Sequence, residues 1–307
     1  MTTHEPVDLK LIIERHKRRD AIFGILGLLL MFAAVATLLV LVVDLASKGT
    51  ERLSIHFLMS FPSRFPEKAG VLSAWVGSTL VMFVTAVISV PLGVAAGIYL
   101  EEYARKNFLT GLIEINITNL AGVPSIVFGL MALGIFVHKL NLGASILTAG
   151  LTLSLLVLPI VITATREAIR AVPRHIREAS MAVGATKWQT VKYHVLPYST
   201  GGILTGVVIA LSRAIGETAP LITVGALTFI AFLPSSPFTG TFPYVSFQWI
   251  MDPFTVMPIQ MFNWVSRPQV EFHHNAAAAG LVLLIMTLSM NAVAIFIRFH
   301  FRKKIKW

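Results

Sequence analysis

The sequence contains no cysteine and little charge. The absence of cysteine excludes a disulfide framework, a thiolate metal site, a cysteine nucleophile and a palmitoyl anchor. Charged residues make up only 13% of the 307 residues, about half the share in an ordinary soluble domain, whereas 55% are hydrophobic. Because a soluble fold cannot bury that much apolar surface, the composition excludes a soluble globular protein.

The chain also lacks the motifs of an ATPase and of an enzyme site. The phosphate-binding pattern Gly-x-x-x-x-Gly-Lys-Ser/Thr does not occur, so we expect this chain not to bind ATP in the usual way. Nucleophiles and metal ligands do not cluster, which argues against a membrane-embedded enzyme. Adjacent His273 and His274 would point to different faces of a helix. We therefore expect an interfacial anchor there, no metal site and no cofactor bound by this chain.

Long apolar segments are what the sequence does contain. About 20 apolar residues in a helix cross the hydrocarbon core of a bilayer. The first segment is longer than the apolar core of a signal peptide and is expected to be an uncleaved anchor. The fifth is too long for a straight perpendicular helix, so we expect a kink or re-entrant turn within it. The predicted fold is an all-α polytopic membrane protein with six transmembrane helices, at residues 21–43, 73–100, 119–137, 142–165, 201–233 and 275–297.

The distribution of basic residues predicts the orientation. Short loops rich in Lys and Arg stay on the cytoplasmic side of a membrane. We therefore expect a basic N-terminus (1–20) and a basic C-terminus (298–307) inside the cell, flanking a six-span domain (21–297) whose loop 165–197 is also cytoplasmic. The net charge of +10 is then explained by topology and by contact with anionic lipids, with no nucleic-acid partner. Most basic residues fall on the predicted inner side: Lys10, Arg15, Lys17, Arg18, Arg19, Arg105, Lys106, Arg166, Arg170, Arg174, Arg177, Lys187, Lys192, Arg298, Arg302, Lys303, Lys304 and Lys306.

The loop of residues 165–197 carries helical patterning, although a plain linker needs only a few residues. Pro173 suits the first turn of a helix, and Gly184 suits the left-handed residue that ends one. The pattern predicts two short helices joined by a glycine turn. It fits equally a helix pair lying on the membrane surface and an element on which a partner docks. Apolar residues recur at helical spacing on both sides of the glycine: Ile176, Ala179 and Val183, then Trp188, Val191 and Val195.

A motif in this loop decides between the two interpretations. The string Arg177-Glu178-Ala179-Ser180, followed by Gly184-Ala185 and then Leu196-Pro197, resembles the EAA signature of ABC importer permeases. Ser180 stands where that family usually has alanine, and His194 where it usually has an aliphatic residue. The resemblance implies a type I (MetI-like) permease architecture with a cytoplasmic coupling helix, which seats in a groove of a separate ATP-hydrolysing subunit. The implied coupling residues are Glu178, Ala179, Gly184, Ala185, Leu196 and Pro197.

Three further strings resemble the PstA family of phosphate permease subunits. The sister PstC family usually lacks the third string and the Thr-Ala-Pro-Leu ending of the second. The resemblance extends from the second span to the last. It implies a PstC-like second permease subunit, two PstB-like ATPases that use ATP and Mg, and a PstS-like phosphate-binding protein outside, in the inner membrane of a bacterium or archaeon. The strings are AGVPSIVFGL at 121–130, RAIGETAPL at 213–221, and Phe262-Asn263-Trp264 with Arg267-Pro268-Gln269 and Glu271-Phe272-His273.

Arg213 and Glu217 are ionisable residues inside the fifth apolar segment. Burying an arginine at such a depth costs about 2.5 to 3.5 kcal/mol on insertion scales, and intramembrane ionisable residues are functional by default. A spacing of four places both side chains on one helix face, where they can pair. A guanidinium supplies two parallel N–H groups to adjacent phosphate oxygens. We expect Arg213 and Glu217 to line the substrate path; the alternative is a neutral structural pair.

Small residues and prolines flank this pair. Pro220 lacks an N–H and leaves the carbonyl of Gly216 without its helical partner, so we expect a helix break there. Ser125 is a further candidate for the path, although Gly122, Pro124 and Ser125 fit close helix packing better.

The favoured function is therefore the membrane subunit of an ATP-driven phosphate importer. A permease for another oxyanion, such as sulfate or molybdate, is an alternative in the same class. An ATP-independent secondary phosphate transporter is a second alternative, but it leaves the patterned loop of residues 165–197 unexplained.

Overall fold

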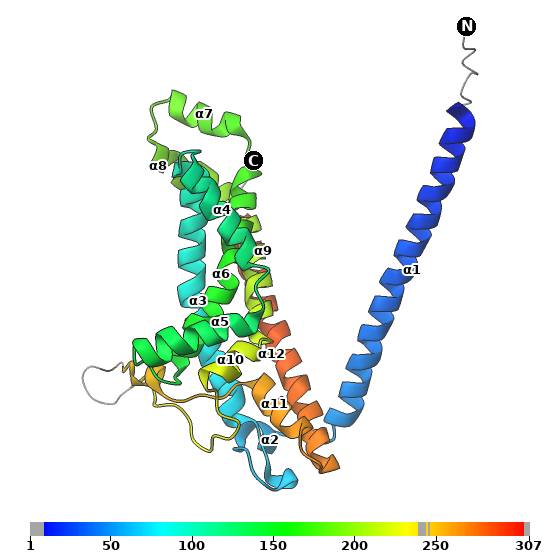
Figure 1. The fold of residues 1–307 in the computed structure, drawn as a ribbon, viewed down its shortest axis with the longest axis vertical. Coiled ribbons are helices and arrows are strands. Elements are labelled where there is room, and N and C mark those ends of the chain that lie inside the picture. The colour runs from blue at the N-terminus through cyan, green and yellow to red at the C-terminus, as the bar shows by residue number, and fades with distance from the viewer. Residues whose placement is uncertain (1–8, 239–243, 245, 304–307) are drawn as a thin grey trace.

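A computed structural model of the protein describes residues 9–238, 244 and 246–303, and long helices dominate it (Figure 1). Five helical stretches are long and apolar enough to cross a membrane, and a bent helix pair makes six if it is counted as one span. This agrees with the predicted all-α polytopic architecture. The long helices are α1 (Leu9–Gly49), α3 (Leu72–Ile98), which continues into the π-helical turn η2 (Tyr99–Tyr103), α6 (Ile146–Arg170), α9 (Leu196–Ile215) and α12 (Val270–Lys303).

Close packing at glycines holds α3, α6 and α9 together. A Cβ atom on Gly93 of α3 would lie 2.6 Å from a methyl carbon of Val161 on α6. A Cβ atom on Gly206 of α9 would lie 2.1 Å from the Cβ of Ala164 on α6. Small residues let helix backbones approach closely, and in a bilayer such packing replaces the hydrophobic driving force that lipid removes. The helix α6 is therefore the centre of the bundle.

The helix α1 is attached differently. It leans away from the bundle and meets it only near its C-terminal end, where it packs on α12 (Figure 1). Gly49 there lies against the backbone of Ala277, and Leu45 lies against Gly280. No residue in the most apolar part of α1 is buried by the rest of the described chain. Its side chains are therefore available to lipid or to another subunit.

The third predicted span differs from the structure. The prediction of one helix over 119–137 is wrong at its start and in its straightness, because α4 (Phe108–Leu120) and α5 (Ser125–Ala132), which continues into the π-helical η3 (Leu133–Lys139), are bent by 106°. Pro124 disfavours helical backbone in the residue before it, so the chain turns at this point.

The fifth predicted span, 201–233, is also corrected. The helix begins earlier, because α8 (Lys187–Thr190) and the π-helical η4 (Val191–Val195) run directly into α9. It ends at Ile215, and a second short helix, α10 (Ala219–Val224), follows. Residues 225–233 are apolar but not helical. Their backbone finds partners within the protein, since Leu227 N–H donates to the Phe254 carbonyl and Ser73 donates to the Ile230 carbonyl.

The end of the bundle opposite α7 (Arg174–Ala182) is made of short helices. They are α2 (Ile55–Met59), η1 (Pro66–Lys68), η5 (Gln248–Met251) and α11 (Met257–Val265). Trp264 and Phe272, both from the third PstA-like segment (residues 262–273), are fully buried and pack with Phe57. Arg267 lies over the Phe272 ring with its guanidinium carbon 4.3 Å from the ring centroid. This segment therefore contributes the core of the end of the bundle opposite α7.

Candidate functional site

The predicted helix pair is present at the end of the molecule where α1 begins and α12 ends (Figure 1). Pro173 precedes α7 as its N-cap. Gly184 has a φ of 89°, the left-handed conformation that ends a helix. Thr186 and Gln189 form a capping box at the start of α8, which fixes where the second helix begins. Leu196 and Pro197 then open α9, with the proline in its first turn.

The buried face of α7 differs from the predicted apolar stripe. Only Ile176 of that stripe packs inward, against a cluster that contains Ile169, Val172 and Val195. Ala179 is exposed and Val183 is 86% exposed. Ser180 also faces inward, and its hydroxyl lies 2.9 Å from that of Thr190 on α8. A polar residue faces inward because it has a hydrogen-bond partner there, which periodicity of apolar residues cannot reveal.

The outward face of α7 is consequently free. Glu178 and Ala179 are exposed there, next to Val183. Beside them, Gly184, Ala185 and His194 contribute to a hollow of about 350 Å³. His194 is exposed, while Val191 and Val195 on either side of it are buried, so the unusual histidine does not disturb the packing of this helix. An exposed surface with apolar and acidic groups is one on which a protein partner can dock.

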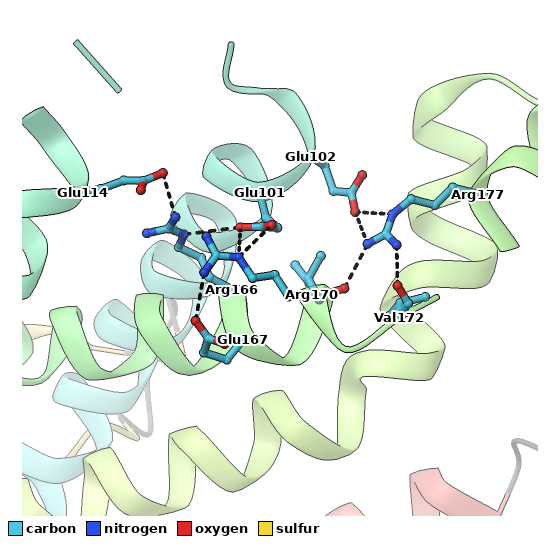
Figure 2. A network of polar contacts seen from close by, with 9 residues as sticks. Glu101, Glu102, Glu114, Arg166, Glu167, Arg170, Val172 and Arg177 are labelled. Carbon is cyan, nitrogen blue, oxygen red and sulfur yellow. Dashed lines mark hydrogen bonds and ion pairs between the residues drawn. The ribbon is translucent and has the colours of Figure 1, made fainter. Parts of the chain in front are cut away.

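Behind α7 lies a network of ion pairs that the sequence analysis did not find (Figure 2). Its basic members entered that analysis as topology markers, and Arg177 also as the first residue of the EAA-like string. The signal that was available is the acidic pair Glu101-Glu102 at the end of an apolar segment. The network contains Glu101 and Glu102 from η2, Glu114 from α4, Arg166, Glu167 and Arg170 from α6, and Arg177 from α7.

Arg213 and Glu217 lie at the break between α9 and α10. The Arg213 Nε atom lies 3.4 Å from the Glu217 Oε1 atom. The helix ends at Ile215, so Glu217 follows the helix and does not share its face, yet the two side chains still pair. The Arg213 side chain is 47% exposed and that of Glu217 is 19% exposed. About half of the Arg213 side chain is therefore left uncovered by the described chain, and its place in the last turn of α9 suits a positive charge.

The helix break lies at the two residues that the sequence marked. Gly216 is the C-cap of α9, and Pro220 lies in the first turn of α10. Pro220 also meets Gly129 of α5, where an added Cβ atom would lie 2.6 Å from the Pro220 Cα. The two PstA-like segments AGVPSIVFGL (121–130) and RAIGETAPL (213–221) therefore cross at this contact. Gly122, in contrast, is exposed in the turn between α4 and α5, and a Cβ atom added there would meet only the Asn119 carbonyl of the preceding helix.

Ser125 is the first residue of α5 and is half-buried. Among the described residues there is no group of three His, Asp or Glu side chains that could hold a metal ion. A His273 ring nitrogen lies 3.0 Å from the Arg267 carbonyl oxygen, and one of His274 lies 3.2 Å from that of Lys48. The two rings therefore face different neighbours.

Comparison with known proteins gives relatives along most of the chain. A relative in Bacillus subtilis strain 168, named probable ABC transporter permease protein YqgI, is 32% identical over 80% of this chain and 83% of its own length. The phosphate transport system permease protein PstA of Haemophilus influenzae is 33% identical over 85% of this chain and 86% of that protein. PstA of Pasteurella multocida is 30% identical over 94% of this chain and 97% of that protein.

Solved structures share the fold. A bacterial alginate ABC transporter chain, crystallised with an alginate pentasaccharide-bound periplasmic protein, superposes with a TM-score of 0.65 at 12% identity, covering 94% of this chain and 98% of that one. A chain of the inward-facing MetNI methionine ABC transporter gives a TM-score of 0.55 at 15% identity, covering 74% and 94%. These likenesses confirm the expected permease architecture. Residues 89–307 match the family described as binding-protein-dependent transport system inner membrane component, and the chain belongs to that family.

Proposed function

We propose that this chain is a permease subunit of an ATP-driven importer that moves inorganic phosphate into the cell. The observation that carries the proposal is the identity of 30–33% with PstA proteins over most of the chain. The crossing of the AGVPSIVFGL and RAIGETAPL strings at Gly129 and Pro220 supports it, because two segments of the resemblance build one place in the fold.

In the proposed orientation, α7 and both termini face the cytoplasm. The start of α1, the α7 region and the end of α12 lie at one end of the molecule (Figure 1). An even number of crossings requires the two termini to share a side, and the excess of Lys and Arg at this end favours the inside. The exposed face of α7, with Glu178, Ala179 and Val183, then docks on the ATPase subunit.

The proposed path passes Arg213. A phosphate stripped of water needs donors in a fixed arrangement, and the half-exposed guanidinium of Arg213 supplies them. Glu217 pairs with the arginine when the path is empty and lowers the net positive field when the anion is present. The anion is therefore bound weakly enough to leave, as conduction requires. Ser125, at the start of α5, is proposed as a further residue of the path.

The remaining components come from partners. We propose a PstC-like second permease subunit, two PstB-like ATPases that use ATP and Mg, and a PstS-like phosphate-binding protein on the outer side. In this proposal, the PstB-like subunits hydrolyse the ATP and this chain hydrolyses none.

Purification of the chain with its partner subunits in lipid nanodiscs tests the proposal. The assembled complex should hydrolyse ATP faster when its binding protein is loaded with phosphate than when it is loaded with sulfate or molybdate. If another oxyanion stimulates ATP hydrolysis and phosphate does not, the complex transports that oxyanion and not phosphate. Phosphate uptake into vesicles that lack ATP would instead identify a secondary transporter.

A further inference from the structure

The residue Arg177 occupies the junction of three helices on the α7 side of the molecule (Figure 2). Its Nε and Nη2 atoms donate to one oxygen of Glu102 at 2.9 and 2.7 Å. Its Nη1 atom donates to the Val172 carbonyl at 2.7 Å, and Nη2 donates to the Ile169 carbonyl at 2.9 Å. Arg177 belongs to α7, the two carbonyls lie at the C-terminal end of α6, and Glu102 lies in η2 at the end of α3. One side chain thus joins α3, α6 and α7.

The contact is directional because it consists of hydrogen bonds, and it is largely shielded from water. The Arg177 side chain is 18% exposed and that of Glu102 is 9% exposed. An ion pair with little access to water is screened far less than an exposed pair. The Ile169 carbonyl, in the last turn of α6, also accepts from the Val172 N–H at 3.1 Å, and Val172 lies just beyond the helix. Arg177 therefore adds two donors to a helix end that already has a backbone bond.

The neighbouring ion pairs extend the link to α4. Arg166, whose side chain is 11% exposed, lies 2.7 Å from Glu114 of α4 and 3.6 Å from Glu101. Arg170 lies 3.0 Å from Glu101. These ion pairs join the ends of α3 and α6 to each other and to the middle of α4. Arg177 adds α7 to this group through the adjacent carboxylate, Glu102.

The other contacts of α7 differ in kind. Ile176 packs in an apolar cluster with Ile169, Val172 and Val195, and apolar contacts are non-directional. Ser180 contacts Thr190 of α8, which is continuous with α9 through η4. Without Arg177, a displaced α7 would remain joined to the end of α6 by residues 171–173 and attached to α8 and α9, and it could turn on that short connection and slide over the apolar cluster. With Arg177, the orientation of α7 on the end of α6 is fixed, and its displacement also moves the end of α3.

We propose that Arg177 and Glu102 form a clamp that transmits movement of α7 to the transmembrane helices α3 and α6. Arg177 is a positioning residue in this scheme and touches neither the transported anion nor ATP. The proposal rests on the proposed function in one respect, which is that α7 is displaced by a partner ATPase.

Four variants of the complete complex test the clamp. Arg177→Gln removes the charge and most of the hydrogen-bond donors. Arg177→Lys keeps the charge but lacks the planar guanidinium with its several donors. Glu102→Gln removes the acidic partner and leaves the sequence of α7 unchanged. Glu167→Gln is the matched control, because Glu167 belongs to the same network but is 64% exposed and contacts Arg170 of its own helix. Measured quantities are ATPase co-purification, basal hydrolysis, stimulation by the loaded binding protein, and phosphate uptake.

Loss of the clamp should leave the ATPase bound and basal hydrolysis within about twofold of the unmodified complex. Stimulation by the loaded binding protein should fall to near the basal rate, and uptake should fall at least tenfold, with Arg177→Lys intermediate and Glu167→Gln unchanged. The double variant of Arg177→Gln and Glu102→Gln should be no worse than Arg177→Gln alone, since residues that act through one link are non-additive.

Several results would overturn the clamp. Full stimulation and uptake in Arg177→Gln would do so, as would loss of ATPase binding, which would assign Arg177 to docking. Multiplied losses in the double variant would show two independent roles. If Arg177→Gln fails to assemble, Glu102→Gln decides on its own by the same criteria. If phosphate does not stimulate the unmodified complex, the proposed function is wrong, and the variants are compared with the oxyanion that does stimulate it.

Discussion

Replacing Arg213 by glutamine removes the guanidinium but keeps a hydrogen-bonding side chain in the last turn of α9. The structure sets the size of the effect under each interpretation of the pair. With a separation of 3.4 Å and an arginine that is 47% exposed, the ion pair contributes at most about 1 kcal/mol to stability. A hydrogen bond from a charged donor to an anion contributes roughly 1.5 to 3 kcal/mol. Loss of anion contact should therefore lower uptake by a factor of roughly 10 to 150, with little effect on assembly.

The double variant Arg213→Gln, Glu217→Gln separates the two interpretations. A purely structural pair is replaced by two neutral amides, so the double variant should both assemble and transport normally. If Arg213 contacts the anion, the double variant should assemble yet remain inactive. Glu217→Gln alone should bind phosphate more tightly and release it more slowly. The assay is uptake of radiolabelled phosphate into proteoliposomes, normalised to assembled complex. Uptake near the unmodified level in the double variant would refute anion contact by Arg213.

Three further predictions concern α7 and the bundle. Gly184→Val should sharply reduce recovery of the ATPase in a pull-down, because a β-branched residue at a φ of 89° is strained by about 1–2 kcal/mol, whereas Gly184→Asn should retain binding. A cysteine at Val183, which is 86% exposed, should react with an impermeant thiol reagent in inside-out vesicles stripped of the ATPase and not in intact cells. Gly206→Leu should lower the melting temperature and the yield of the complex, because the added side chain overlaps Ala164 and overpacking costs typically 1–3 kcal/mol.

Each of these has a result that contradicts it. Equal ATPase recovery with Gly184→Val would remove the glycine turn from the docking surface. Labelling of the Val183 position from outside intact cells would show that the predicted topology is inverted. An unchanged melting temperature for Gly206→Leu, with Gly201→Leu as the control at an open position of the same helix, would show that α6 and α9 are not in close contact.

Hydropathy sufficed for five of the spans and for most of their positions, because apolar length is what a bilayer selects. It failed where polar residues lie inside a helical segment. The helix α4 contains Glu114 and Asn116, which lower its hydropathy and led the predicted span to begin too late. In the structure, Glu114 is neutralised by Arg166 from α6, a partner far away in sequence. Such a pair can be recognised only once the fold brings its members together.

The same reason explains what was missed on α7. The motif placed the helix pair and the glycine turn correctly, since both depend on local backbone preferences. The orientation of α7 depends on Ser180 meeting Thr190 and on Arg177 meeting Glu102, which are contacts between separate elements. The pairing of Arg213 with Glu217 was predictable because it is local, whereas its place beyond the end of α9 depended on the helix break.

The contact between α5 and α10 also determines how a helix break can exist at membrane depth. Both are short helices that lie between the two ends of the bundle (Figure 1), and neither spans a bilayer alone. A hydrocarbon environment cannot supply hydrogen-bond partners to the backbone at their ends. The protein supplies several of them: the Glu217 N–H donates to the Ala214 carbonyl, and the Thr223 hydroxyl donates to the Pro220 carbonyl. The break beside Arg213 can therefore persist inside a bilayer because the protein, and not lipid, satisfies its backbone.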